Sequence, residues 1–294
     1  MEWVIDKAHD GMMIRDYLQS VHGFSQRIIK AVKFDGGHIT VNASSVTVRY
    51  RLTSGDRLNV QFPPEKKGAH MLPEDLDLHI VYEDMDILVI DKQPGIPVIP
   101  SFQHLTGTVA NAVLGHYEKK QIPFTIHTVT RLDRDTSGLM LIAKHRYSHS
   151  ILAGFQKSGS IKRSYQAIIE GRLSEKEGTI DLPIGREEGS IIERAVTANG
   201  KSAVTHYKVI QDFFDCALIQ VQLETGRTHQ IRVHFSHLGH PLLGDTLYGG
   251  KAGQMNRQAL HCDEISFPHP ATKNIVRFES SLPNDMEKVI KSKP

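Results

Sequence analysis

The sequence predicts an α+β protein built on a mostly antiparallel sheet, with a small unit in front of it. From residue 76 onward strand-like runs outnumber helical ones, and they do not alternate regularly with helices as in a parallel α/β sheet. The first 62 residues follow a different pattern, and a segment rich in proline and charge, residues 63–75, separates the two parts. We therefore expect a domain at 1–62, a linker at 63–75 and a large domain at 76–294.

The first 62 residues predict two short helices followed by strands. Ser25 is a suitable N-cap for the second helix, and Gly36-Gly37 should end it. The expected helices lie at 12–18 and 24–32, and the expected strands at 38–42 and 57–62. On the second helix Arg27, Lys30 and Lys33 are spaced at i, i+3 and i+6, roughly on one face. We interpret this face as a phosphate contact, although a merely solubilising face would have the same spacing.

The large domain predicts seven main strands interrupted by three helices. The strand-like runs are short, apolar and rich in β-branched residues, whereas the helical stretches are longer and amphipathic. The expected strands lie at 78–82, 87–91, 139–143, 164–170, 203–210, 216–223 and 274–279, and the expected helices at about 108–119, 146–157 and 229–238.

Composition is that of an ordinary soluble globular chain. Its 294 residues are 39% hydrophobic and 23% charged, and no apolar run approaches the ~20 residues that span a bilayer. The first residues lack the pattern of a signal peptide, so a cytoplasmic location is expected. The two cysteines, Cys216 and Cys262, make no disulfide framework and are expected as buried free thiols.

The most informative run is Arg131-Leu132-Asp133-Arg134-Asp135-Thr136-Ser137-Gly138, which places two carboxylates between two guanidinium groups. A neighbouring cation favours the ionised carboxylate, which can then act as a nucleophile or a base. A salt-bridged surface turn would use the same residue types. Residues 127–165 hold seven Lys and Arg against two Asp. This basic segment suits a polyanionic partner.

The same run resembles the Arg-Leu-Asp-x-x-Thr-Ser-Gly signature of the RluA family of pseudouridine synthases. Four further blocks resemble that family in the same order: Tyr82-Glu83-Asp84 through Lys92-Gln93-Pro94-Gly95, Lys162 to Ala167, Thr225 to His234 with Gly239-His240-Pro241 and Gly244-Asp245, and Leu260-His261 with Phe267 to Pro270. The first 62 residues resemble the αL RNA-binding fold of a small-subunit ribosomal protein, a module that family members often carry.

The resemblance implies a catalytic domain around a mixed sheet, with its active site in a cleft across the sheet. It implies an isomerase that detaches uracil from ribose at N1 and reattaches it through C5. This change involves neither net redox chemistry nor hydrolysis, so no cofactor and no metal are expected. The expected partner is RNA, most often large-subunit ribosomal RNA, with transfer RNA as the second choice. A monomer is the default oligomeric state.

The resemblance also assigns roles to individual residues. Asp133 matches the catalytic aspartate, acting as nucleophile or base, and is preferred over Asp135. Arg232 matches the basic residue that pairs with that aspartate, and Tyr165 the active-site tyrosine, whose ring can stack on uracil. Arg131 matches the residue that fills the place of the extruded nucleotide. A last group, expected to hold the cleft or contact phosphate, consists of Arg227, His229 and Gln230.

Two positions depart from the family pattern. Thr130 stands where the family often has a histidine, which removes any histidine-dependent packing or RNA contact at that point. The family's Lys-Pro-x-Gly turn reads Lys92-Gln93-Pro94-Gly95, with the proline shifted by one, so the turn can differ in shape.

Three other functions were weighed. A metal-dependent hydrolase would draw on His234, His237 and His240, but Gly239 and Pro241 should end the helix before all three share a face. A non-catalytic RNA-binding factor would not need the Asp133, Tyr165 and Arg232 set. Methyl transfer by a cysteine nucleophile would need a basic, polar environment that neither cysteine has.

Overall fold

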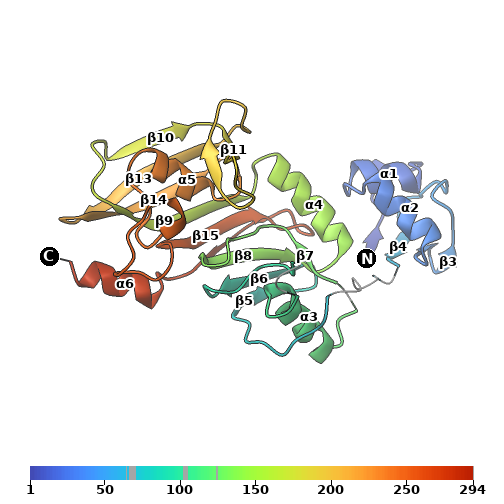
Figure 1. The fold of residues 1–294 in the computed structure, drawn as a ribbon. Helices are drawn as coiled ribbons and strands as arrows, with labels where there is room; N and C mark the ends of the chain where they lie inside the picture. The colour runs from blue at the N-terminus through green and yellow to red at the C-terminus, as the bar shows by residue number, and fades with distance from the viewer. Residues whose placement is uncertain (64, 66–70, 102–104, 124, 294) are drawn as a thin grey trace.

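The computed structural model describes residues 1–63, 65, 71–101, 105–123 and 125–293. The chain forms a large sheet domain and a small N-terminal unit at one end of it (Figure 1). This is the α+β architecture that the sequence predicts.

The N-terminal unit is a four-stranded antiparallel sheet covered by two helices. Its strands run in the order β1-β4-β2-β3. The elements are β1 (Glu2–Val4), a 3₁₀ turn (Lys7–His9), α1 (Ile14–Ser20), α2 (Gln26–Phe34), β2 (His38–Val41), β3 (Ser44–Ser45) and β4 (Arg57–Gln61). Ser25 caps α2, since its hydroxyl accepts a hydrogen bond from the Ile28 amide at 3.2 Å. Both helices begin two residues later than predicted.

The second sheet has ten strands, in the order β10-β13-β14-β9-β15-β8-β6-β5, with β16 paired to β15 and β7 paired to β8. Its strands are β5 (Ile80–Glu83), β6 (Ile87–Lys92), β7 (His127–Thr128), β8 (Ser137–Ala143), β9 (Lys162–Glu170), β10 (Glu177–Asp181), β13 (Val204–Asp212), β14 (Cys216–Leu223), β15 (Leu260–Pro268) and β16 (Ile275–Glu279). The helices are α3 (Val109–Lys119), α4 (Arg146–Lys157), α5 (Gln230–His237) and α6 (Asn284–Lys291), with a 3₁₀ turn at Thr246–Tyr248. A separate hairpin joins β11 (Ile184–Arg186) to β12 (Arg194–Val196).

The large sheet is mixed because one of its pairs is parallel. Strands β15 and β8 pair in parallel at His261 with Ser137 and at Cys262 with Gly138. Gly138 makes this approach possible, since a Cβ there would lie 2.3 Å from the Cys262 carbonyl oxygen. Its φ of +110° is also one that residues with a side chain rarely adopt.

Strand β8 is buried on both faces and lies at the centre of the domain. Leu139 and Leu141 point into a core shared with α5, whereas Met140 and Ile142 point into a core formed with α3. This explains why the run reads as continuously apolar rather than alternating. The loop that precedes β8 therefore leads into a rigid part of the fold.

The expected elements do not include β10, the β11–β12 hairpin or α6. They also lack the short strands β1, β3 and β7, and the apolar pattern did not predict β15. The hairpin strands have only three residues each, and the segment between them carries glycine and glutamates that interrupt any alternation. Helix α6 is short and polar, and only Met286 and Val289 of it are buried.

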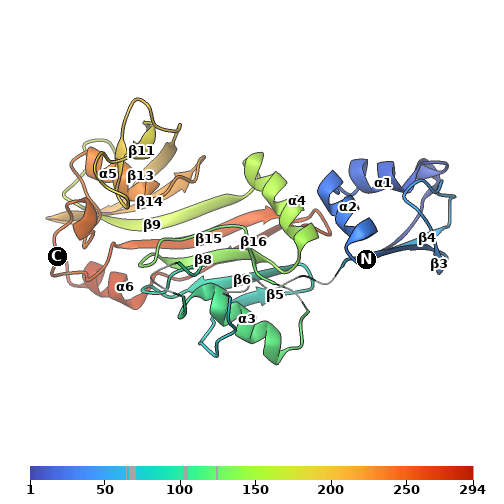
Figure 2. The same ribbon diagram turned by 45° about the vertical axis from the view of Figure 1, so that its right-hand side comes forward.

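The N-terminal unit shares its core with the large domain. Tyr147 and Ile151 of α4 join the cluster that contains Phe24 and Ile28, and the Tyr147 hydroxyl donates to the His22 carbonyl at 3.0 Å. Figure 2 shows α4 between the sheet and α2. Within the predicted linker, Glu65 accepts a hydrogen bond from the Arg146 amide at 2.9 Å and pairs with His127 at 2.8 Å.

None of the helices in the described part of the chain combines the length and apolar character needed to cross a bilayer.

Candidate active site

The loop that carries Asp133 runs from β7 into β8 and is a tight turn. The Thr136 amide donates to the Asp133 carbonyl at 3.2 Å. Main-chain oxygens of the same loop accept hydrogen bonds from two buried cations, Lys92 to Arg134 at 2.7 Å and Arg257 to Asp135 at 3.2 Å. The main chain next to Asp133 is thus held by residues distant in sequence.

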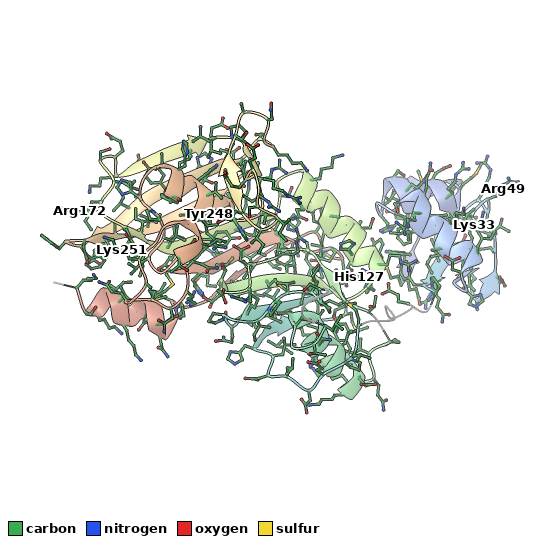
Figure 3. The ribbon with its side chains drawn as sticks, in the orientation of Figure 1. Lys33, Arg49, His127, Arg172, Tyr248 and Lys251 are labelled. Carbon is green, nitrogen blue, oxygen red and sulfur yellow. The ribbon has the colours of Figure 1, made fainter. Side chains whose placement is uncertain are left out.

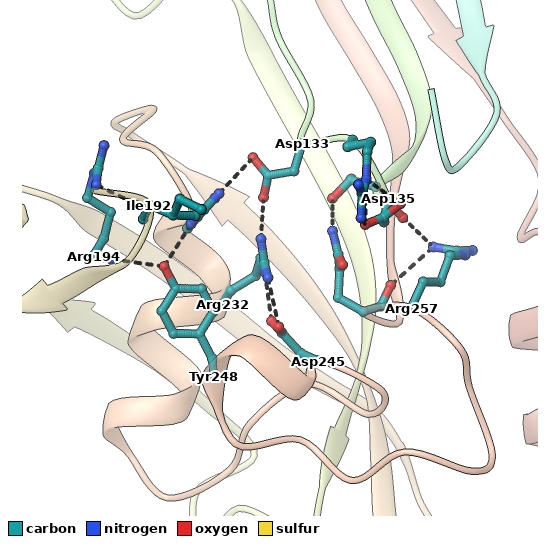
Figure 4. A network of polar contacts seen from close by, with 12 residues as sticks. Asp133, Asp135, Ile192, Arg194, Arg232, Asp245, Tyr248 and Arg257 are labelled. Atoms are coloured by element: carbon teal, nitrogen blue, oxygen red, sulfur yellow. Dashed lines mark hydrogen bonds and ion pairs between the residues drawn. The ribbon is translucent and has the colours of Figure 1, made fainter. Parts of the chain in front are cut away.

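Arg232 lies between two carboxylates (Figure 4). Its Nη1 donates to Asp133 Oδ2 at 3.2 Å. Its Nε and Nη2 donate to the two carboxylate oxygens of Asp245, each at a distance of 2.7 Å. The Arg232 and Asp245 side chains are 7% and 1% exposed, so the planar guanidinium is fixed and its Nη1 is positioned to orient Asp133.

The charges around Arg232 keep it protonated despite its burial. Burial lowers the pKa of Arg232, but the hydrogen bonds and charges of Asp245 and then Asp133 outweigh that effect and raise it above its ordinary value. The Arg232 guanidinium also lies over the Tyr248 ring, 4.9 Å from its centroid. Asp133 therefore faces a permanent positive charge.

Tyr165 lies on β9 in the same cleft and is 4% exposed. Burial raises its pKa well above the ordinary value, so the phenol stays protonated at neutral pH. Arg163 donates to the Tyr165 hydroxyl at 3.3 Å. The hydroxyl can therefore donate a proton or a hydrogen bond, but it does not act as a phenolate base.

A cleft of about 370 Å³ brings the predicted site residues together. Asp133, Tyr165 and Arg232 line it, along with Arg131, Arg227, His229 and Gln230. Further positive charge comes from Arg134 and Arg163. Arg27, Lys30 and Lys33 do not line it. They are exposed on α2, in the N-terminal unit, where Figure 3 labels Lys33 and Arg49 far from Tyr248.

The Gln230 side chain stabilises the cleft wall, because both its amide oxygen and its amide nitrogen form hydrogen bonds within the protein. Its oxygen accepts from the Thr225 hydroxyl at 2.8 Å and the Arg227 amide at 3.0 Å. Its nitrogen donates to Val204 and Thr205. Of the two roles expected for this residue, the structure supports holding the cleft. Arg227 donates through Nε to the Ser202 carbonyl at 2.9 Å.

The second aspartate of the loop has a different environment. Asp135 pairs with its exposed neighbour Arg134 at 2.9 Å. Its side-chain hydrogen bonds within the described part of the chain come from Arg134, whereas Asp133 accepts one from Arg232. This difference supports Asp133 as the reactive carboxylate.

Sequence reasoning assigned no role to three residues that build the site. Lys92, only 2% exposed, donates to the carbonyls of Gln93, Ile96 and Arg134. Arg257 pairs with Asp285 of α6 at 2.7 Å while it holds the Asp133 loop. Asp245 orients Arg232. For Asp245 the available sequence signal was its place in Gly244-Asp245, one of the blocks that resemble the family.

The two departures from the family pattern have local explanations. Thr130 is 1% exposed, and its hydroxyl accepts a hydrogen bond from the Leu141 amide at 2.9 Å. It therefore fastens the loop to β8. The Lys92-Gln93-Pro94-Gly95 turn has φ of +85° at Gly95 and closes around the Lys92 ammonium.

Two of the three histidines considered for metal binding, His234 and His240, have protein partners. Both ring nitrogens of His234 lie 2.9 Å from oxygens of Thr205 and Leu182, and His240 contacts the Glu170 carbonyl. Helix α5 ends at His237, before His240, as Gly239 predicts. Asp84, Asp86 and His269 form one group with metal-ligand spacing among the described residues. Asp84 there already accepts two amide hydrogen bonds and the His269 contact.

Both cysteines are buried free thiols, as predicted. Burial raises the pKa of Cys216 to about 11 and that of Cys262 to about 12. Neither is a thiolate at neutral pH, which argues against a cysteine nucleophile.

Comparisons with known proteins show which family the chain belongs to. A family model described as RNA pseudouridylate synthase matches residues 86–237. The uncharacterized RNA pseudouridine synthase YjbO of Bacillus subtilis is 50% identical over 95% of this chain and 99% of its own. The ribosomal large subunit pseudouridine synthase D of Pseudomonas aeruginosa is 41% identical over 85% of this chain and 82% of its own.

A solved structure shares the fold. Human RNA pseudouridylate synthase domain containing 1 superposes with a TM-score of 0.60 at 22% identity, over 76% of this chain and 90% of that one. Fold and site thus define an RNA-modifying isomerase with a mixed-sheet catalytic domain. The chain belongs to the RluA-type family of RNA pseudouridine synthases.

Proposed function

We propose that Asp133 is the catalytic carboxylate of this pseudouridine synthase and that Arg232 orients it. The observation that carries the proposal is the Asp133–Arg232–Asp245 chain, which fixes one carboxylate in a cleft rich in arginine. The other carboxylate of the loop, Asp135, is paired with its own neighbour Arg134.

The reaction breaks the bond between uracil N1 and the anomeric carbon of ribose and forms a bond from C5 to that carbon. Asp133 either attacks the anomeric carbon or removes a proton from the sugar, and the base rotates in the cleft before it reattaches. The C5 hydrogen leaves as a proton and N1 takes up a proton in place of its bond to the sugar, so atoms and electrons balance without an added co-reactant. Arg232 would stabilise the carboxylate each time the reaction regenerates it.

Tyr165 and Arg131 are proposed to handle the target nucleotide. The Tyr165 ring would stack on uracil, and its protonated hydroxyl would donate to the base. Arg131 is exposed at the rim of the same cleft. Its guanidinium plane would occupy the position of the extruded uridine, and Arg227 and His229 would line the path of the nucleotide.

The N-terminal unit, residues 1–62, is proposed as an RNA-docking domain joined by residues 63–75 to the catalytic domain, 76–294. Arg27, Lys30 and Lys33 on the exposed face of α2 would contact phosphates. The shared core with α4 supports a fixed distance between this face and the cleft.

We propose large-subunit ribosomal RNA as the substrate, in the cytoplasm, with the protein acting as a monomer. Support comes from relatives named ribosomal large subunit pseudouridine synthase D in Pseudomonas aeruginosa and Buchnera aphidicola, at 41% and 38% identity. Transfer RNA is the alternative substrate.

A release assay tests the proposed catalytic role. RNA transcripts carrying tritium at uridine C5 should lose it to water when the wild-type protein is added, because C5 exchanges its hydrogen for the sugar. Asp133→Asn should release none while still binding RNA, and Asp135→Asn should release nearly as much as wild type. Release by Asp133→Asn at the wild-type rate would refute the assignment.

The same pair of variants addresses the non-catalytic alternative. If the protein were only an RNA-binding factor, neither the wild type nor either variant would release tritium from a ribosomal or transfer RNA transcript.

A further inference from the structure

His229 has a strained backbone at the edge of the cleft. It precedes α5 with φ of +58° and ψ of +19°, a left-handed conformation that costs energy in a residue with a side chain. Its side chain is 13% exposed, and its Nε2 lies 3.9 Å from Asp133 Oδ1. The strain thus places an imidazole beside the carboxylate oxygen that Arg232 does not contact.

The other nitrogen of His229 contacts Tyr248. Its Nδ1 lies 2.7 Å from the Tyr248 hydroxyl oxygen. That oxygen also accepts a hydrogen bond from the main-chain N–H of Arg194 on β12, at 3.0 Å (Figure 4). A main-chain N–H can only donate, so the direction of this second bond is fixed.

These two contacts determine which nitrogen of His229 carries the proton. Burial raises the pKa of Tyr248, so its hydroxyl keeps its hydrogen at neutral pH. Among the described residues, His229 Nδ1 is the acceptor within reach of that hydrogen. If Nδ1 accepts, the neutral ring carries its hydrogen on Nε2, which faces Asp133.

The groups around His229 are two carboxylates, two guanidinium groups and one phenol. They are Asp133 from the loop, Asp245 and Tyr248 after α5, Arg232 from α5 and Arg194 from β12. Burial lowers the pKa of His229, and the two arginines act in the same direction against the two aspartates. The neutral ring is therefore the form expected at pH 7.

We propose that Tyr248 is a positioning residue that fixes His229 as the Nε2–H tautomer and so aims a second N–H donor at Asp133. This proposal deepens the proposed catalytic role of Asp133 and rests on it. Arg232 would hold Oδ2 while His229 faces Oδ1. At 3.9 Å the second contact is an approach, and closing it by roughly 1 Å would complete a hydrogen bond.

Nitrogen NMR of the full chain tests the tautomer without any turnover. The protein is labelled with ¹⁵N-histidine, and the two ring nitrogens of His229 are assigned by their loss in His229→Gln. In wild type at pH 7, Nε2 should carry the hydrogen and Nδ1 should be bare. Tyr248→Phe should yield a mixture of tautomers. A wild-type ring protonated on Nδ1, or an unchanged tautomer in Tyr248→Phe, would overturn the proposal.

Kinetics provide the second readout. Tyr248→Phe should lower kcat about tenfold with little change in the KM for RNA, and should shift the acid limb of the kcat–pH profile. Tyr82→Phe removes a phenol on β5 that donates to Asp84 and should change neither. Equal changes in both variants, or a Tyr248→Phe effect confined to KM, would contradict a positioning role. Absence of turnover in wild type would refute the proposed function and leave the tautomer result standing.

Discussion

Lys92 donates a hydrogen bond to the main-chain oxygen of Arg134 over 2.7 Å, across 42 residues of sequence. The same ammonium donates to the carbonyl oxygens of Gln93 and Ile96, so it joins the turn after β6 to the Asp133 loop. Burial lowers the pKa of Lys92 to about 8, while the nearby Asp135 and Asp133 oppose that shift. At neutral pH the side chain is therefore mostly charged and can offer all three N–H donors.

Replacing Lys92 by Met keeps an unbranched side chain one atom shorter and removes its three donors. The carbonyls of Gln93, Ile96 and Arg134 lose their buried cationic partner, which should lower the free energy of unfolding by roughly 2–4 kcal/mol. The loop should also lose its fixed position, with a fall in kcat of about 10²-fold. Urea unfolding and the tritium-release assay measure the two effects. Lys119→Met, at an exposed site on α3, is the matched control, and a Lys92→Met enzyme with wild-type kcat would remove the loop-holding role.

Replacing Asp245 by Asn tests the orientation of Arg232. The amide keeps the shape of the carboxylate but leaves a buried guanidinium without its two-pronged ionic partner. We expect unfolding to become easier by about 3 kcal/mol, and kcat to fall more than the KM for RNA rises, because Asp133 loses its orientation. Stability and rate equal to those of wild type would show that Arg232 does not need Asp245.

The N-terminal unit should lose stability in mild acid because of His22. Burial, with Lys273 and His9 nearby, lowers the pKa of His22 to about 4, and its ring packs 4.4 Å from that of Trp3. Between about pH 4 and 6.5 the unfolded chain binds a proton that the folded one does not. The free energy of unfolding should therefore rise with pH across that window, by at most about 1.4 kcal/mol per pH unit from this group.

Trp3 makes this measurement local, since it is the one tryptophan in the chain. Urea unfolding followed by its emission at pH 4.5, 5.5 and 6.5 should show the dependence in wild type and a weaker one in His22→Gln. The same slope in both proteins would assign the effect to other groups.

Reversing two charges on α2 tests the docking face. Arg27→Glu with Lys30→Glu should weaken binding to RNA roughly tenfold at moderate salt and flatten the dependence of affinity on salt, because phosphate contacts are lost. The control is Lys208→Glu with Lys288→Glu, which makes the same charge change at exposed sites on the large domain. Equal weakening by both pairs would mean that only net charge matters.

Local signals in the sequence predicted much of the fold. The Ser25 N-cap, the end of α5 before Gly239 and the central apolar strand at 139–143 all depend on nearby residues, and all are present. The β11–β12 hairpin was not predicted, because each of its strands has three residues and no clear alternation.

The candidate site was predictable only in part, for a physical reason. The family motifs pointed to Asp133, Tyr165 and Arg232, and the fold places all three in one cleft. The residues that hold them in place act across the chain. Arg257 contacts the Asp133 loop across 122 residues of sequence. Tyr248 contacts His229 because the chain turns back after α5 ends. Such contacts leave no periodic pattern in the sequence.

The most direct test of the account is a pseudouridine map of ribosomal and transfer RNA by carbodiimide chemistry. Cells lacking the protein are compared with cells supplied with the wild-type chain or with Asp133→Asn. One or a few sites in large-subunit ribosomal RNA should disappear in the deletion, return with the wild-type chain and stay absent with Asp133→Asn. Return of those sites with Asp133→Asn would contradict the catalytic role of that carboxylate, and sites lost only from transfer RNA would contradict the substrate.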